Sequence, residues 1–101
     1  MKFDIKNNSG ENLNNLMRKI GYFFHQESGS ELSFTRPFDR SGYPRFHLYV
    51  KADSDNRTIF MNLHLDQKKA IYKGTHAHSG EYEGEILKQE VDRIIKIAEA
   101  N

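Results

Sequence analysis

The chain has 101 residues with 15 Lys and Arg against 14 Asp and Glu, so its formal charge of +1 shows no overall basic excess that would indicate a nucleic-acid binder. Hydrophobic residues make up 37%, enough for one core and a single domain over residues 1–101, and the absence of cysteine excludes disulfides, thiolate nucleophiles and cysteine-based metal sites. No apolar run reaches the roughly 20 residues that span a bilayer, and the polar–apolar alternation of the first six residues is unlike a signal peptide, so a cytoplasmic protein is expected.

The first part of the chain predicts a strand, a helix and a hairpin. Residues 1–6 alternate between polar and apolar and favour a strand. Apolar residues then recur at helical spacing over residues 11–20, and Gly21 follows as the stop. Residues 22–26 are short and aromatic, and residues 32–36 return as a partner after a tight loop, which predicts a hairpin of two strands.

A second hairpin is predicted from two longer segments, residues 45–51 and 58–66, which alternate clearly between apolar and polar side chains. Taking residues 53–56 as the connecting loop places apolar residues opposite apolar ones. In this register His47 lies opposite Asn62 on the polar face of the hairpin.

An irregular stretch over residues 70–84 is expected next, followed by a second helix over about residues 85–99 with an apolar stripe. The predicted order is therefore β-α-β-β-β-β-α. This is an α+β domain with a mainly antiparallel sheet, two helices on one face and the other face largely open.

Turn residues in the first half follow a recognisable spacing: Gly21-Tyr22, Gln26, Gly29-Ser30 and Pro37. This spacing resembles that of HicA-type toxins, small RNA-cleaving partners of antitoxins, over about residues 12–50, with the C-terminal helix in the expected place. The resemblance implies a fold similar to the double-stranded-RNA-binding domain, α-β-β-β-α. The catalytic histidine of that family directly follows Gly-Ser, where this chain has Glu31, so the resemblance implies an architecture and leaves any catalytic residue unknown.

Three other segments, residues 44–47, 64–69 and 74–82, resemble parts of a small uncharacterised bacterial protein family. That resemblance implies a bacterial source and supplies no activity.

Four of the five histidines are expected to converge. His47 and His64 share the polar face of the second hairpin with Asp66, and an extended His76-x-His78 in a Gly/Ser-bounded loop would place both rings on one side. Imidazole nitrogens with a carboxylate oxygen suit zinc, nickel or iron, and the same groups can act as base and acid in phosphodiester cleavage. One hypothesis is therefore a divalent-metal or hydrolase site formed by His64, Asp66, His76 and His78. The simpler interpretation is a polar loop beside a solvated sheet face, with no cofactor.

Positive charge gathers on the side of the second hairpin. Residues 36–51 have four Lys or Arg against one Asp, and residues 67–79 have three Lys and no acid. Cations attract phosphates by counterion release, and exposed rings stack on bases, so the pattern predicts a module that binds nucleic acid, most simply RNA. The alternative is that these cations only keep a sheet edge soluble. The predicted contact residues are Arg45, His47, Tyr49, His64, Lys68, Lys69 and Lys73.

A third hypothesis concerns aromatic residues. Phe38, Tyr49 and Phe60 are candidates for an exposed patch, and such patches are typical of protein–protein surfaces. The sequence is therefore compatible with an RNA-binding module, with a histidine-based metal-binding protein or hydrolase, and with an interaction domain that dimerises through the open sheet face. No membrane partner is expected.

Overall fold

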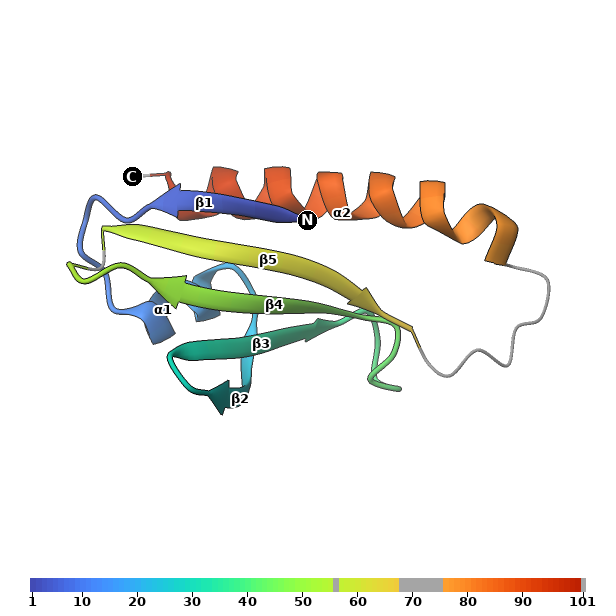
Figure 1. Cartoon of the computed structure of the whole chain (residues 1–101), viewed down its shortest axis with the longest axis horizontal. Helices are drawn as coiled ribbons and strands as arrows, with labels where there is room; N and C mark the ends of the chain where they lie inside the picture. Colours follow the sequence, from blue (N-terminus) through green and yellow to red (C-terminus); the bar gives the residue numbers. More distant parts are fainter. Residues whose placement is uncertain (56, 68–75, 101) are drawn as a thin grey trace.

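Five strands form one antiparallel sheet in the spatial order β1-β5-β4-β3-β2, and two helices complete the fold (Figure 1). This computed structural model describes residues 1–55, 57–67 and 76–100, with the backbone alone for residues 76–83. The predicted α+β class, with an antiparallel sheet and two helices, is confirmed. The elements in chain order are β1 (Lys2–Lys6), α1 (Leu13–Lys19), β2 (Phe23–Ser28), β3 (Glu31–Pro37), β4 (Arg45–Ala52), β5 (Thr58–Asp66) and α2 (His76–Ala98).

The hydrophobic core lies between one face of the sheet and both helices. Alternate residues of each long strand point into it because successive side chains of a strand point to opposite faces. The helices contribute their apolar stripes, and Leu16, Ile20 and Ile94 are at most 1% exposed. The buried apolar residues are Ile5, Leu16, Met17, Ile20, Tyr22, Phe34, Phe46, Leu48, Val50, Ile59, Met61, Leu63, Val91 and Ile94.

Helix α1 begins and ends where its flanking residues satisfy its free backbone groups. The side chain of Asn12 accepts hydrogen bonds from the backbone N–H groups of Asn14 and Asn15, at 2.8 and 3.4 Å. Gly21 then reverses the chain with φ of +91°, a conformation that glycine adopts without strain. Tyr22 was predicted to begin a strand, but this turn places its side chain in the core, where it is 1% exposed. The strand begins at Phe23 instead.

Helix α2 begins at His76 rather than near residue 85, so the prediction of an irregular segment is wrong for residues 76–84. Gly80 and Gly84 both lie within the helix, because a glycine weakens a helix by about 1 kcal/mol and does not end it. His76 and His78 therefore have helical backbone. The extended His-x-His on which the predicted chelation depended is not formed.

The register of the second hairpin differs from the predicted one by two residues. His47 lies opposite His64, not Asn62, and Arg45 lies opposite Asp66. The cause is a wider turn, in which the Asp53 carboxylate accepts hydrogen bonds from the backbone N–H groups of residues 57 and 58, at 3.0 and 3.2 Å. Because the shift is an even number of residues, every side chain stays on its predicted face.

The first hairpin turns through Gly29 and Ser30 alone, with Ser28 opposite Glu31. A β-bulge interrupts the pairing of β2 with β3, because Phe24 lies opposite Phe34 whereas Gln26 lies opposite Ser33, which leaves His25 as the extra residue. Together β1 and β5 add two strands to the α-β-β-β-α pattern that the resemblance implied.

A buried polar cluster joins α2 to the rest of the fold. Glu90 is 4% exposed, and its carboxylate accepts hydrogen bonds from the Tyr22 hydroxyl at 2.7 Å and from Arg93 Nε at 2.8 Å. Arg36, on β3, also donates to Glu90, at 3.3 Å, and Arg93 Nη2 donates to the carbonyl of Ile20 at 2.6 Å. Glu90 thus fixes α2 against Tyr22 and β3, and Arg93 fixes it against the end of α1.

Candidate nucleic-acid interface

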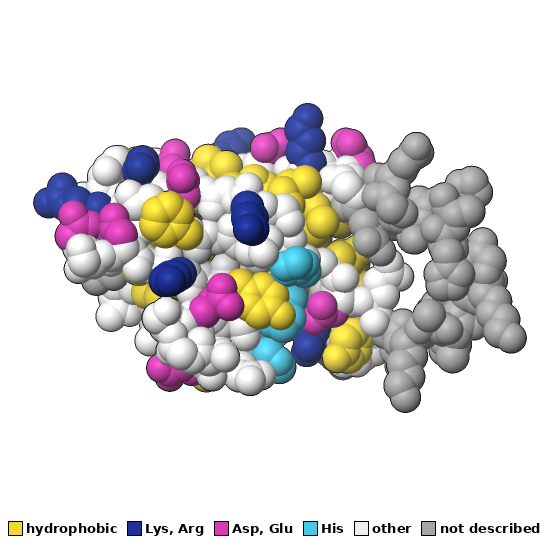
Figure 2. Space-filling view, viewed as in Figure 1, with side chains coloured by type: hydrophobic (Ala, Val, Ile, Leu, Met, Phe, Trp, Pro, Cys, Tyr) yellow, Lys and Arg dark blue, Asp and Glu magenta, His cyan; other side chains and the backbone are white. Residues whose placement is uncertain are grey.

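The sheet face opposite the helices carries polar, aromatic and charged side chains in close mixture. Figure 2 looks onto this face and shows histidine side chains beside hydrophobic, basic and acidic ones. Strands β4 and β5 lie next to each other near the middle of the sheet and supply most of the predicted contact residues. The residues of these two strands that alternate with the core ones are Arg45, His47, Tyr49, Lys51, Thr58, Phe60, Asn62, His64 and Asp66.

Four rings contact one another in a chain across this face, which we call the ring cluster. His47 and Tyr49 stack with ring centroids 4.5 Å apart, and the Tyr49 ring meets the ring of His64 edge-on at 5.4 Å. His25 meets His47 edge-on at 5.2 Å. The structure therefore brings together three of the predicted contact residues.

The fourth ring, His25, was not predicted to belong to the cluster. It reaches the ring of His47 across β3, where the outward-facing residues Ser33 and Thr35 are small. The bulge at position 25 directs this side chain, and such irregularities re-aim side chains without a clear signal in the sequence.

Asp66 anchors the ring cluster at the end of β5. Its Oδ2 accepts hydrogen bonds from His47 Nδ1 at 2.9 Å and from Arg45 Nε at 3.1 Å. The Arg45 guanidinium also lies over the ring of Tyr43, 4.7 Å from its centroid. These contacts hold Arg45 and His47 in place, so in this structure both residues support the neighbouring rings.

His47 is itself 9% exposed, and its Nε2 has no hydrogen-bond partner among the described residues. Its Nδ1 is the donor toward Asp66, because a carboxylate only accepts hydrogen bonds. His64 differs because it is exposed. Its pKa lies below the ordinary value because of partial burial first, then the Met1 ammonium group and His47, against the opposing charge of Asp66.

The residues predicted to bind a metal are only partly described. His64 and Asp66 share the open face, whereas the side chains of His76 and His78 lie outside the described residues. Within the described part of the chain, no group of three histidine or acidic side chains is placed to hold a metal ion. Lys68, Lys69 and Lys73, predicted to contact nucleic acid, also lie outside the described residues.

An open hollow of about 530 Å³ lies on the same face, over β1, β5, β4 and the start of β3. Two neighbouring cross-strand rows form it. In one row Lys2 lies opposite Asn62, and Asn62 lies opposite Tyr49. In the other row Asp4 lies opposite Phe60, and Phe60 lies opposite Lys51. Glu31 also lines the hollow, from β3.

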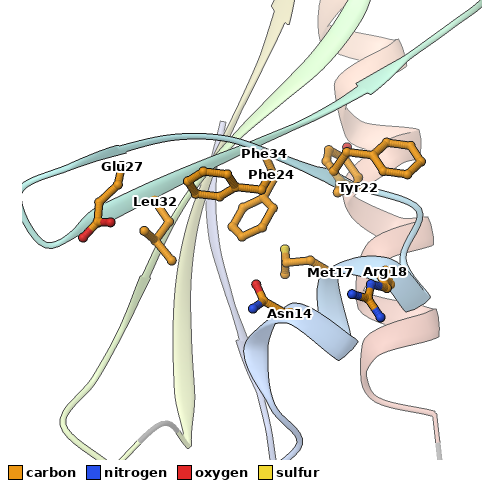
Figure 3. A pocket seen from close by; sticks show the side chains of 9 residues that line it. Asn14, Met17, Arg18, Tyr22, Phe24, Glu27, Leu32 and Phe34 are labelled. Carbon is orange, nitrogen blue, oxygen red and sulfur yellow. The ribbon is translucent and has the colours of Figure 1, made fainter.

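A second hollow, of about 510 Å³, lies on the helix side between α1 and the first hairpin (Figure 3). Figure 3 shows the side chains of Met17, Phe24 and Phe34 gathered above α1. Phe24 is 58% exposed and Phe23 is 67% exposed, so β2 presents two aromatic residues at the edge of the sheet.

The predicted patch of Phe38, Tyr49 and Phe60 is divided between the two sides of the sheet. Tyr49 and Phe60 share the open face, but Phe38 packs against the core residue Phe46 with ring centroids 4.8 Å apart. Phe38 therefore belongs to the helix side, where it shares a hollow with Ile86 and Gln89 of α2.

Comparison of the chain with protein-family models, curated proteins and solved structures finds no match. The resemblance to HicA-type toxins and to the double-stranded-RNA-binding domain therefore stays a prediction. No helix in the described ranges is long and apolar enough to cross a membrane.

Proposed function

We propose that this protein is a binding module for single-stranded RNA, which lies across the open sheet face. The observation that carries the proposal is the ring cluster, because it presents Tyr49 and His64 side by side on a face that no described element covers. Exposed rings on a sheet stack on successive unpaired bases, at about 1–3 kcal/mol per base. A double helix keeps its bases stacked inside, so the single strand is the better match to a face of rings.

The open face has few free positive charges among its described residues, which suits a ligand held mainly by stacking of its bases. Lys2 and Lys51 are exposed beside Tyr49 and Phe60, where they can meet phosphate groups. Arg45 already bonds to Asp66, so its contribution to this proposal is to position the rings. Lys68, Lys69 and Lys73 stay predicted phosphate contacts.

The proposal is tested with one RNA of ten nucleotides, offered as a single strand and as a duplex with its complement. We expect amide NMR shifts on β4 and β5 with the single strand. Tyr49→Leu keeps a side chain suited to a strand but removes the stacking ring, so we expect about tenfold or greater loss of affinity. Phe24→Leu, an aromatic residue on the helix side, is the matched control and should bind normally.

The same titration separates the alternatives. Equal binding by wild type and Tyr49→Leu would contradict the proposed surface. No shift with RNA, together with a dimer in sedimentation, would favour the interaction domain. Shifts of the histidines on addition of zinc alone would favour the metal-binding protein.

A further inference from the structure

We infer that the hollow between Tyr49 and Phe60 is a binding slot for one guanine base of the RNA. This inference rests on the proposed function and names the nucleotide that the open face prefers. It follows from the positions of two rings, two carboxylates and two lysines around one hollow.

The two rings line the same hollow from neighbouring strands. Tyr49 and Phe60 are diagonal neighbours on β4 and β5, because Asn62 lies opposite Tyr49 and Lys51 lies opposite Phe60. Residues in such diagonal positions are about 7 Å apart. That separation equals two aromatic contacts of about 3.5 Å each, which one intervening base would make.

A carboxylate at the rim of the hollow selects the base. Asp4 and Glu31 both line the hollow, and within the described ranges neither carboxylate takes part in an ion pair. A carboxylate only accepts hydrogen bonds, and guanine alone among the four bases offers it two adjacent donors, N1–H and the N2 amino group. Adenine and cytosine offer one amino group each beside a ring nitrogen acceptor that would face the second carboxylate oxygen.

Acidic residues on a face that binds RNA also need an explanation of their own. Asp4 and Glu31 repel phosphates, so on a surface that met only the RNA backbone they would weaken binding. Lys2 and Lys51 line the same hollow and place positive charge beside the two acids. A nucleotide carries both a base edge that can donate to a carboxylate and a phosphate that a lysine attracts. The mixture of acids and lysines therefore suits one whole nucleotide better than a phosphate group alone.

The test compares wild-type binding to a ten-nucleotide oligouridine with binding to the same RNA carrying one central guanosine, inosine, adenosine or cytidine. We expect the guanosine RNA to bind about tenfold more tightly than the adenosine and cytidine RNAs. Inosine, which lacks the N2 amino group, should fall between them. This series needs no variant, so a folding defect cannot obscure it.

Variants then assign the preference to the carboxylates. Asp4 and Glu31 lie on β1 and β3 with two strands between them, so one guanine edge meets only one of the two carboxylates. Either Asp4→Asn or Glu31→Gln should therefore reduce the ratio of guanosine to adenosine affinity, whereas Glu27→Gln, a carboxylate outside this hollow, should leave that ratio unchanged. Equal affinity for all five RNAs would overturn the guanine slot and leave the RNA-binding proposal standing. Absence of binding to every RNA would overturn both.

Discussion

His47 and His64 lie opposite each other on neighbouring strands, yet their surroundings differ. His47 is buried and donates to a carboxylate, whereas His64 is exposed and lies near the Met1 ammonium group, which donates to the carbonyl of Leu63 at 2.9 Å. The two imidazoles therefore have different roles in the ring cluster. His47 fixes its geometry, and His64 presents a ring whose pKa is lowered, first by partial burial.

A lowered pKa of His64 predicts a pH dependence of stability. Because burial and the nearby Met1 ammonium disfavour the charged ring, the folded protein binds this proton less readily than the unfolded chain, where the pKa is 6.5. The free energy of unfolding should then fall as the pH drops below 6.5, with no contribution from His64 above that value.

Urea unfolding of wild type and His64→Gln at pH 7.5 and at pH 5.5 measures this contribution. We expect wild type to lose more stability than the variant between the two pH values. A proton NMR titration of the ring should give a pKa below that of an unfolded control peptide. An equal or higher pKa would contradict the prediction.

At the scale of elements, Glu90 fixes the position of α2. The helix has a modest apolar stripe, of which Val91 and Ile94 are buried, and the polar cluster adds bonds to β3 and to the end of α1. Burial and the neighbouring Glu90 carboxylate raise the pKa of the Tyr22 hydroxyl, so Tyr22 stays protonated and donates to that carboxylate. The pKa of Arg93 is likewise raised, first by its hydrogen bonds to Glu90.

Glu90→Gln should destabilise the protein by about 3 kcal/mol, because it leaves two partly buried guanidinium groups without their carboxylate. Tyr22→Phe should cost about 1.5 kcal/mol, as it removes one hydrogen bond to a charged group. Asp92→Asn, at an exposed position of the same helix, is the control and should change stability by less than about 0.5 kcal/mol. Urea unfolding measures all three, and a wild-type midpoint for Glu90→Gln would contradict this role.

At the scale of the whole molecule, the two edges of the sheet differ. The backbone N–H of Lys6, on the edge strand β1, donates to the carboxylate of Glu99 just beyond α2, at 3.0 Å. The other edge strand, β2, is exposed along its whole length. Lys2 lies on β1 and Lys51 on the central strand β4, and both line the hollow of the open face. The positive charge proposed to meet RNA is therefore local, on a molecule whose formal net charge is only +1.

This distribution predicts a shallow dependence of RNA affinity on salt. Each phosphate contact with a single strand contributes about −0.7 to the slope of log affinity against log salt concentration. Replacing both Lys2 and Lys51 by Gln should therefore flatten the slope by about 1.4. Lys88→Gln with Lys96→Gln, two exposed lysines on α2, should leave it unchanged. An unchanged slope for the first pair would remove both lysines from the interface.

Much of this architecture was readable from the sequence because it depends on local periodicity. The alternation over residues 58–66 predicted β5 with the bounds that the structure has, and the helical spacing before Gly21 predicted α1. The same alternation placed Arg45, His47, Tyr49 and His64 on one face, since the two-residue period of a strand does not depend on its partner.

Other features depend on contacts between distant residues, and only the tertiary structure decided them. The Asp53 carboxylate widened the turn and moved the register by two residues, which placed His47 opposite His64. The bulge brought His25 into the ring cluster, and packing on the sheet divided Phe38 from Phe60. Sequence periodicity therefore determined which side chains share a face. Their neighbours on that face were set by hydrogen bonds and packing across the sheet, which have no local period in the sequence.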